Sequence, residues 1–168
     1  DRLPALMRCW LGHPYDFHGT ATVPGEGKIA CGYFVAVIMR DSGFKINRIR
    51  VAQQPSQNII RTFVNHRKFY EVKTNTPYPE YIDHINTKYE GIHIVGLDTH
   101  VAFIVIKDGE MRYIHSSGGQ ERCVVDEGID NASSLKNSNY RVISNISRNR
   151  AVLKKWILGE TFDTVISN

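Results

Sequence analysis

The sequence predicts an α+β fold in which helices from the first part of the chain pack on an antiparallel sheet formed by the second part. Apolar residues three and four positions apart, typical of helices, come first, at residues 3–11, 31–42 and 55–64. From Ile92 onward, runs rich in β-branched residues replace this pattern, and the turn sequence Lys107-Asp108-Gly109-Glu110 joins two of them. A last helical pattern over residues 147–158 closes the chain.

The segment around Cys31 has clear signals for the start and the end of a helix. A Gly/Pro-rich loop leads into Cys31, and an apolar run follows as far as Met39. We expect a helix over residues 31–42, with Cys31 in its first turn and Gly43 as its C-terminal cap. The dipole and the free N–H groups of a helix start favour a thiolate, with pKa values of roughly 3.5–7.5 in such cysteines. The alternative is a core cysteine, because free cysteine is among the most buried residue types.

The other elements follow from apolar spacing and from breaker residues. A short amphipathic helix over Leu3–Leu11 precedes a loop that glycines and prolines interrupt between Gly12 and Gly27. Phe44–Val51 is expected to be a loop or a short extended piece, and Pro55 fits the first turn of the next helix. We further expect a polar segment at 71–79, a short helix near 80–86, and strands at 92–95, 100–106, 111–117, 123–125 and 140–143.

Length and composition indicate one globular domain spanning residues 1–168. The chain is 42% hydrophobic and 23% charged, which is ordinary for a soluble domain with a real core. No apolar run approaches the roughly 18 residues of a membrane helix, so no transmembrane segment is expected. The formal net charge of +4 suits an anionic partner, such as a cell-wall polymer, a nucleic acid or a lipid surface, without selecting one.

The three cysteines, Cys9, Cys31 and Cys123, leave at least one free thiol. Cys9 and Cys123 could pair in an oxidising compartment, although nothing in the sequence brings the two positions together. The chain has no Cys-x-x-Cys motif, so a structural zinc site is not expected.

A two-residue turn at Asp108-Gly109 would fix which residues face each other in the predicted hairpin. Counted outward from the turn, the facing pairs are Lys107 with Glu110, Ala102 with His115, and His100 with Ser117. His100 and His115 then lie on one face as diagonal neighbours, with backbones roughly 7–8 Å apart. Both faces of the hairpin are largely apolar, which predicts that each face is covered. A three-residue turn would place the two rings on opposite faces.

Two histidines on a mostly apolar face need partners, because unpaired polar groups are costly to bury. Together with a cysteine at a helix start, they favour catalysis, with Cys31 as the nucleophile, His100 as the base and His115 orienting the His100 ring. The alternatives are two histidines satisfied separately, by backbone carbonyls or at a solvent edge, or a metal site completed by Asp98 or His93. No metal-spaced or phosphate-binding motif supports a bound ion or nucleotide, so neither a metal nor an organic cofactor is expected.

Four segments, in order, resemble the NlpC-like cysteine peptidases, papain-like bacterial enzymes that cut peptide bonds in peptidoglycan stem peptides. They are Leu11–Gly19, Ala30–Val35, Gly43–Arg48 with Gln53-Gln54, and His100–Phe103 with Tyr113–Ser116, and the similarity extends over roughly residues 3–125. The resemblance implies a papain-like fold in a single NlpC-like catalytic domain over residues 1–168. It places the nucleophile, the base and the orienting histidine on Cys31, His100 and His115. It also implies that the Tyr15 hydroxyl lies beside the Cys31 N–H, where a tetrahedral oxyanion forms.

The chain departs from the family pattern around the nucleophile. Relatives usually carry Asp-Cys-Ser-Gly, whereas this chain has Ala30-Cys31-Gly32-Tyr33, and their aromatic-Gly-Gly loop becomes Phe17-His18-Gly19. The missing carboxylate and hydroxyl are groups that relatives use to recognise the free amine of the substrate. The reaction chemistry is therefore better supported than the specificity, and the bond that is cleaved could differ from the family norm.

The function expected is a thiol hydrolase that opens a peptide or amide bond through an acyl-enzyme, with peptidoglycan or its muropeptides as substrate. We expect a monomer that binds no nucleic acid and is secreted, periplasmic or attached to the cell envelope. Cys31 must stay reduced there, which gives Cys9 and Cys123 a reason to be buried. Two alternatives stay open: an amidase or transglutaminase-like acyl transferase acting on proteins or lipids, and a catalytically inactive wall-binding or effector module.

Overall fold

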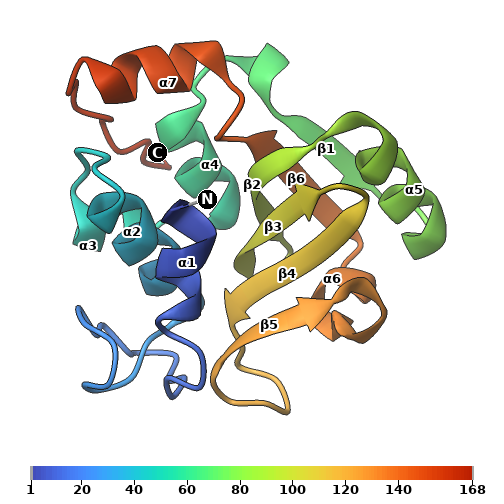
Figure 1. Cartoon of the computed structure of the whole chain (residues 1–168), viewed down its shortest axis with the longest axis horizontal. Helices are drawn as coiled ribbons and strands as arrows, with labels where there is room; N and C mark the ends of the chain where they lie inside the picture. Colours follow the sequence, from blue (N-terminus) through green and yellow to red (C-terminus); the bar gives the residue numbers. More distant parts are fainter. Residues whose placement is uncertain (1, 168) are drawn as a thin grey trace.

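The computed structural model describes residues 2–167, which form seven α-helices and one six-stranded antiparallel sheet (Figure 1). The helices are α1 (Arg2–Arg8), α2 (Cys31–Asp41), α3 (Arg48–Ala52), α4 (Ser56–Phe63), α5 (Tyr78–Lys88), α6 (Ser133–Lys136) and α7 (Arg150–Ile157). The strands are β1 (Glu71–Thr74), β2 (Gly91–Leu97), β3 (Val101–Lys107), β4 (Glu110–Ser116), β5 (Val124–Gly128) and β6 (Tyr140–Asn145), arranged in the order β1-β6-β2-β3-β4-β5. The α+β class and the antiparallel sheet are confirmed, whereas β1 precedes α5 and α6 lies between β5 and β6, so the helices do not all precede the strands.

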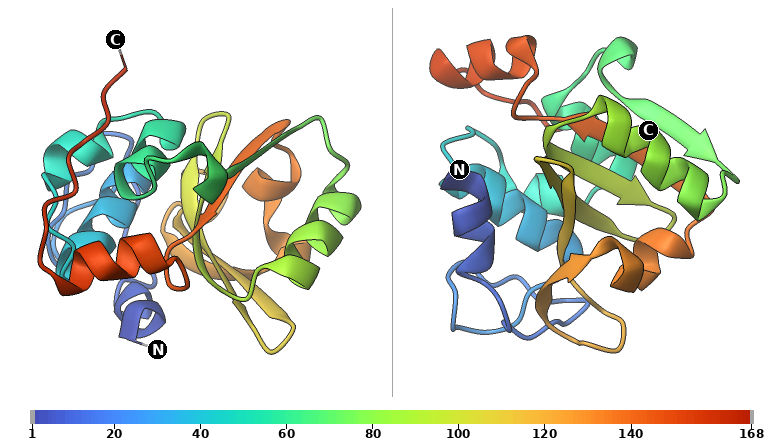
Figure 2. Two further views of the ribbon diagram at one scale, coloured as in Figure 1. Left: turned by 90° about the horizontal axis from the view of Figure 1, so that it is seen from above. Right: turned by 45° about the vertical axis from the view of Figure 1, so that its right-hand side comes forward.

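The sheet lies between two layers of helices, as the left view of Figure 2 shows. Helices α1–α4 and α7 cover one face and contribute to an apolar core with Ile94, Phe103 and Ile114. Helices α5 and α6 cover the other face, where Ile104 and Tyr113 belong to a second core. The β3–β4 hairpin supplies side chains to both cores, which confirms that both of its faces are covered.

Helix α2 is the central helix of the first layer. It packs against β3 and β4 of the sheet and against α1 and α3 beside it, and every residue from Phe34 to Met39 is fully buried. The helix begins at Cys31, as predicted, and Gly43 follows its C-terminal end with φ of +97°, a left-handed conformation that favours glycine. An apolar helix surrounded on all sides in this way holds its first residue in a fixed position.

The hairpin has the predicted register. Lys107 faces Glu110, and Phe103 faces Ile114 farther along the ladder. Asp108 and Gly109 have φ values of 51° and 78°, the positive values that a two-residue type I′ turn requires. The turn residues therefore fix which side chains of β3 and β4 share a face.

Three segments differ from the sequence prediction. Residues 48–52 form α3 rather than a loop or extended piece, because Asn47 caps the helix by accepting the Arg50 N–H and Val51 is buried beneath it. The polar segment at 71–79 contains the edge strand β1, paired with β6, and the helix expected near 80–86 begins earlier, after Pro77.

Among the described helices, none has the length and apolar character needed to cross a bilayer.

The three cysteines are all free, and they differ in exposure. Cys9 is exposed in the turn after α1, so the expectation that it is buried is wrong. Helix α1 ends at Arg8, and the turn leaves the Cys9 side chain facing solvent. Cys123 and Cys31 are each half-buried.

We predict that buried His93 makes the fold less stable in mild acid. The side chain on β2 is 1% exposed, its Nε2 lies 2.6 Å from the Tyr89 carbonyl oxygen, and desolvation lowers its pKa to about 4. The unfolded chain, with an ordinary histidine pKa near 6.5, binds more protons between these values. His93 should therefore cost up to about 3 kcal/mol of unfolding free energy as the pH falls from about 6.5 to about 4.

Urea unfolding at a series of pH values measures this effect. His93→Gln should show a shallower loss of stability across that range than the unmodified chain. His18→Gln, at an exposed position, serves as the control and should leave the slope unchanged. Equal slopes for His93→Gln and the unmodified chain would contradict the prediction.

Candidate active site

His100 and His115 meet as the hairpin register predicts. His100 Nε2 lies 2.7 Å from His115 Nδ1, and the two rings are nearly perpendicular, with centroids 4.8 Å apart. His100 comes directly before β3 and is half-buried, whereas His115, near the end of β4, is 2% exposed. Because Nε2 of His100 takes part in this hydrogen bond, Nδ1 of His100 is the ring nitrogen that can accept a proton from another group.

A third group, Glu127 on β5, was missed by the sequence analysis. Its Oε2 lies 2.7 Å from His115 Nε2, the ring nitrogen opposite the one that contacts His100. In the β4–β5 ladder Tyr113 faces Glu127 and His115 faces Val125, so Glu127 is a diagonal neighbour of His115 on the same face. Predicting this contact from strand register requires the start of β5 and the length of the loop before it, which the sequence pattern does not define.

Cys31 lies beside this pair, at the start of α2. It is half-buried, and it lines a hollow of about 520 Å³ together with His100 and Val101. The N-cap residue Ala30 gives no side-chain hydrogen bond to the helix, and the first turn holds no acidic residue. Neither a capping side chain nor a carboxylate in the first turn therefore competes with the Cys31 sulfur for the N–H groups of the helix start.

The protonation state of Cys31 differs from the prediction. Burial raises the pKa of the Cys31 thiol above its ordinary value, although the backbone N–H groups of Val101, Gly32 and Cys31 itself oppose the shift. Desolvation, with a smaller effect from the His115 charge, lowers the pKa of His100 to about 3. The expectation that the helix start lowers the cysteine pKa is thus wrong, because the loss of water outweighs the dipole. The resting site combines a neutral thiol with a neutral imidazole.

An extended segment before α2 fixes the position of the cysteine. The Ile29 N–H donates to the Pro14 carbonyl at 2.9 Å, and the Ala30 N–H donates to the Gly19 carbonyl at 3.0 Å. The buried Ser116 hydroxyl donates to the Ile29 carbonyl at 2.7 Å. Because Ser116 follows His115 in β4, this bond connects the strand that carries a histidine directly to the segment that carries the nucleophile.

Gly32, directly after the nucleophile, is required by packing. A Cβ at this position would lie 2.5 Å from the Ala52 carbonyl oxygen, at the end of α3, which is far too close for any side chain. The absence of a side chain therefore lets α3 approach the start of α2. A serine at this position would force the two helices apart.

Tyr15 lies on the other side of the histidines. It lines a second hollow, of about 340 Å³, together with His100 and His115, and burial followed by the Cys31 charge raises its pKa. Its ring packs under the Arg122 guanidinium, 5.4 Å from the ring centroid. Trp10 contacts the rings of His13 and Phe34. Tyr15 therefore lies close enough to Cys31 for the Cys31 charge to act on its pKa.

The two residues considered as further metal ligands have other partners. His93 contacts the Tyr89 carbonyl in the middle of the sheet, and Asp98 accepts the Asn139 N–H at 2.9 Å and contacts the Ser138 hydroxyl at 2.9 Å. Within residues 2–167, no group of three or more His, Cys, Asp or Glu side chains is placed to hold a metal ion. Asp98 instead lines the hollow beside Cys31, where it is the acidic side chain.

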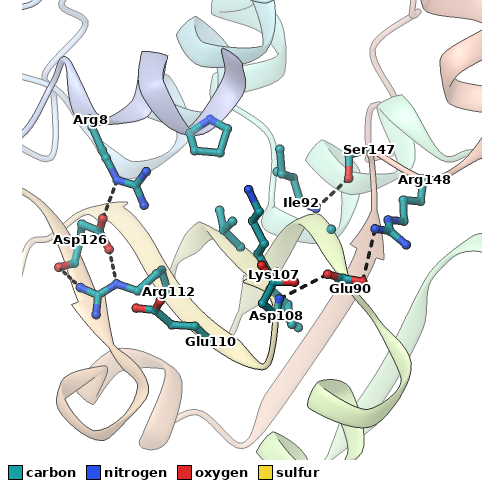
Figure 3. Close-up of a pocket in the computed structure, with 14 residues that line it drawn as sticks. Arg8, Glu90, Ile92, Lys107, Asp108, Glu110, Arg112, Asp126, Ser147 and Arg148 are labelled. Carbon is teal, nitrogen blue, oxygen red and sulfur yellow. Dashed lines mark hydrogen bonds and ion pairs between the residues drawn. The ribbon is translucent and has the colours of Figure 1, made fainter. Parts of the chain in front are cut away.

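A larger hollow, of about 730 Å³, lies elsewhere, near the β3–β4 turn (Figure 3). Its charged side chains are tied to one another: Asp126 accepts from Arg8 at 2.9 Å and from Arg112 at 2.7 Å, and Arg148 pairs with Glu90 at 3.3 Å. Its lining contains no cysteine or histidine. The smaller hollows around Cys31 and His100 hold the reactive groups, so chemistry rather than volume identifies the candidate site.

Comparison with known proteins adds no assignment to this geometry. The sequence matches no protein-family model, and it matches no curated protein. The contacts and side-chain chemistry of Cys31, His100 and His115 are therefore the basis for a functional assignment.

We predict that Ser116→Ala destabilises the fold by about 1–3 kcal/mol, because it leaves the buried Ile29 carbonyl without its hydroxyl donor. Ser133→Ala is the matched control, since that hydroxyl is exposed and reaches the Asn131 carbonyl only at 3.5 Å. It should change the unfolding free energy by less than about 0.5 kcal/mol. Urea unfolding monitored by tryptophan fluorescence distinguishes the two, and equal stabilities would contradict the role of Ser116.

Proposed function

We propose that this chain is a cysteine hydrolase that opens a peptide or amide bond through an acyl-enzyme formed on Cys31. The observation that supports this most directly is the hydrogen bond from His100 Nε2 to His115 Nδ1. It leaves His100 Nδ1 free to accept a proton in the same hollow that Cys31 lines. A nucleophile, a base and a group that orients the base are the three parts that this chemistry needs.

Acylation begins from the neutral pair. His100 Nδ1 accepts the Cys31 thiol proton as the sulfur attacks the carbonyl carbon, and the carbonyl oxygen becomes an oxyanion. The Cys31 N–H at the helix start and the Tyr15 hydroxyl are the donors available to this oxyanion. His100 then gives the proton to the leaving nitrogen, the carbon–nitrogen bond breaks, and a thioester on Cys31 remains.

Deacylation uses the same base. His100 Nδ1 accepts a proton from water as the water oxygen attacks the thioester carbonyl. The carbon–sulfur bond then breaks, the proton returns to the sulfur, and a carboxylic acid is released. Neither step needs a metal or an organic cofactor, because His100 Nδ1 carries each transferred proton.

The arrangement of elements agrees with the papain-like fold that the resemblance implies. A helix that begins at the cysteine packs on an antiparallel sheet, and the base histidine comes directly before one of its strands. Peptidoglycan stem peptides in the cell envelope are the proposed substrate on the strength of that resemblance. The packing at Gly32 gives a physical reason for its departure from the family pattern, because serine does not fit beside α3.

Incubation with purified peptidoglycan tests the proposal, with soluble fragments identified by mass spectrometry. We expect fragment release by the unmodified chain and a loss of about 10³-fold or more in both Cys31→Ala and His100→Ala. Cys9→Ala, which removes an exposed thiol, is the control and should retain activity. Fragment masses also separate hydrolysis from acyl transfer, since transfer to an added amine gives a heavier amide product. Equal release by the unmodified chain and Cys31→Ala would contradict the proposal.

A further inference from the structure

Glu127 is a charged group in contact with His115, and the proposed mechanism does not yet use it. Its side chain is 12% exposed, and its Oε2 lies 2.7 Å from Nε2 of the buried His115. The expected set of site residues contains Cys31, His100, His115 and Tyr15 but not this carboxylate. The role of Glu127 follows from which atoms of Glu127, His115 and His100 can donate or accept a hydrogen bond.

Glu127, His115 and His100 form a series of two hydrogen bonds, and its donors and acceptors can be assigned by starting from Glu127. A carboxylate only accepts hydrogen bonds, so His115 Nε2 carries the proton in its contact with Glu127. In a neutral imidazole the other nitrogen is then an acceptor, so His115 Nδ1 accepts from His100 Nε2–H. His100 Nδ1 is consequently left with a lone pair, which is the state a base needs before it can accept a proton.

The surroundings of His115 leave the ring little freedom other than the choice of tautomer. Its ring lies against that of Tyr113, with centroids 4.2 Å apart, and the Tyr113 hydroxyl is held by the Ser134 hydroxyl at 2.7 Å. Packing therefore fixes the plane of the His115 ring without specifying which nitrogen carries the proton. Glu127, whose carboxylate lies on the Nε2 side of the ring, distinguishes the two nitrogens by its charge.

We infer that Glu127 is a positioning residue that sets the tautomers of His115 and His100 and so keeps His100 Nδ1 unprotonated and available to Cys31. This inference rests on the proposed function for its catalytic consequence, but the tautomers themselves do not depend on any substrate. Glu127 also supports the transient imidazolium on His100, because its negative charge acts through the neutral His115 ring. Without Glu127, His115 can adopt the other tautomer, which presents Nδ1–H to His100 and turns the hydrogen bond around.

Nitrogen NMR of the histidine side chains tests the assignment directly. In the unmodified chain, the Nε2 signals of His100 and His115 should be those of protonated nitrogens, and both Nδ1 signals those of unprotonated ones. Glu127→Ala should convert His115 to a mixture of tautomers. Glu127→Gln should retain the original tautomer, because its side-chain oxygen can still accept from Nε2–H. Glu80→Ala, an exposed glutamate on α5, is the control and should leave the histidine signals unchanged.

Kinetics on peptidoglycan fragments supplies the second measurement. Glu127→Ala should lower kcat by about 10- to 100-fold with little change in KM, and Glu127→Gln should recover part of the loss. Identical histidine spectra for Glu127→Ala and the unmodified chain would overturn the inference, as would unchanged kcat in a variant whose tautomers are mixed. If the unmodified chain cleaves nothing, the proposed function fails, whereas the spectra still decide whether Glu127 sets the tautomers.

Discussion

The hydrogen bond between His100 and His115 is the interaction on which the candidate site depends. It joins β4 to the residue directly before β3, and it depends on the β3–β4 register, which places both rings on one face. A shift of one residue would turn one ring into the opposite core, where α2 and its apolar neighbours leave no polar partner. The positive φ values at Asp108 and Gly109 fix this register, so a turn at one end of the hairpin determines the chemistry available at the other.

The chemical state of Cys31 shows how two opposing effects balance at the start of a helix. A helix terminus typically stabilises a charge by about 0.3–1 kcal/mol, less than one pKa unit. Burial can shift the pKa of a fully buried group by as much as 3–5 units. The raised pKa of Cys31 and the lowered pKa of His100 both follow from the second effect. A site built in this way forms its thiolate together with the attack on the substrate rather than storing it beforehand.

Much of this arrangement could be predicted from the sequence, because the signals were local. The start of α2 at Cys31, its end at Gly43 and the pairing of His100 with His115 depended on neighbouring residues and on one short turn. What could not be predicted depended on tertiary contacts. Helix α3 needs the close approach of Ala52 to Gly32, and the contact of Glu127 with His115 needs the pairing of β5 across a loop of undefined length. The direction of the Cys31 pKa shift requires knowledge of the water excluded around it.

Strand β5 lies at the margin of the sheet, with β4 as its neighbouring strand; on its other side its first residue, Val124, bonds through its backbone to Gly12 and His13. Edge strands separate from a sheet at lower free-energy cost than central ones, because fewer backbone bonds hold them. The carboxylate that distinguishes the two nitrogens of His115 therefore belongs to an edge strand, which opens at lower free-energy cost than the central strands. The nucleophile and both histidines sit on elements held from several sides. Warming would thus release the Glu127 carboxylate from His115 Nε2 while the Cys31 thiol and both imidazoles still kept their native positions.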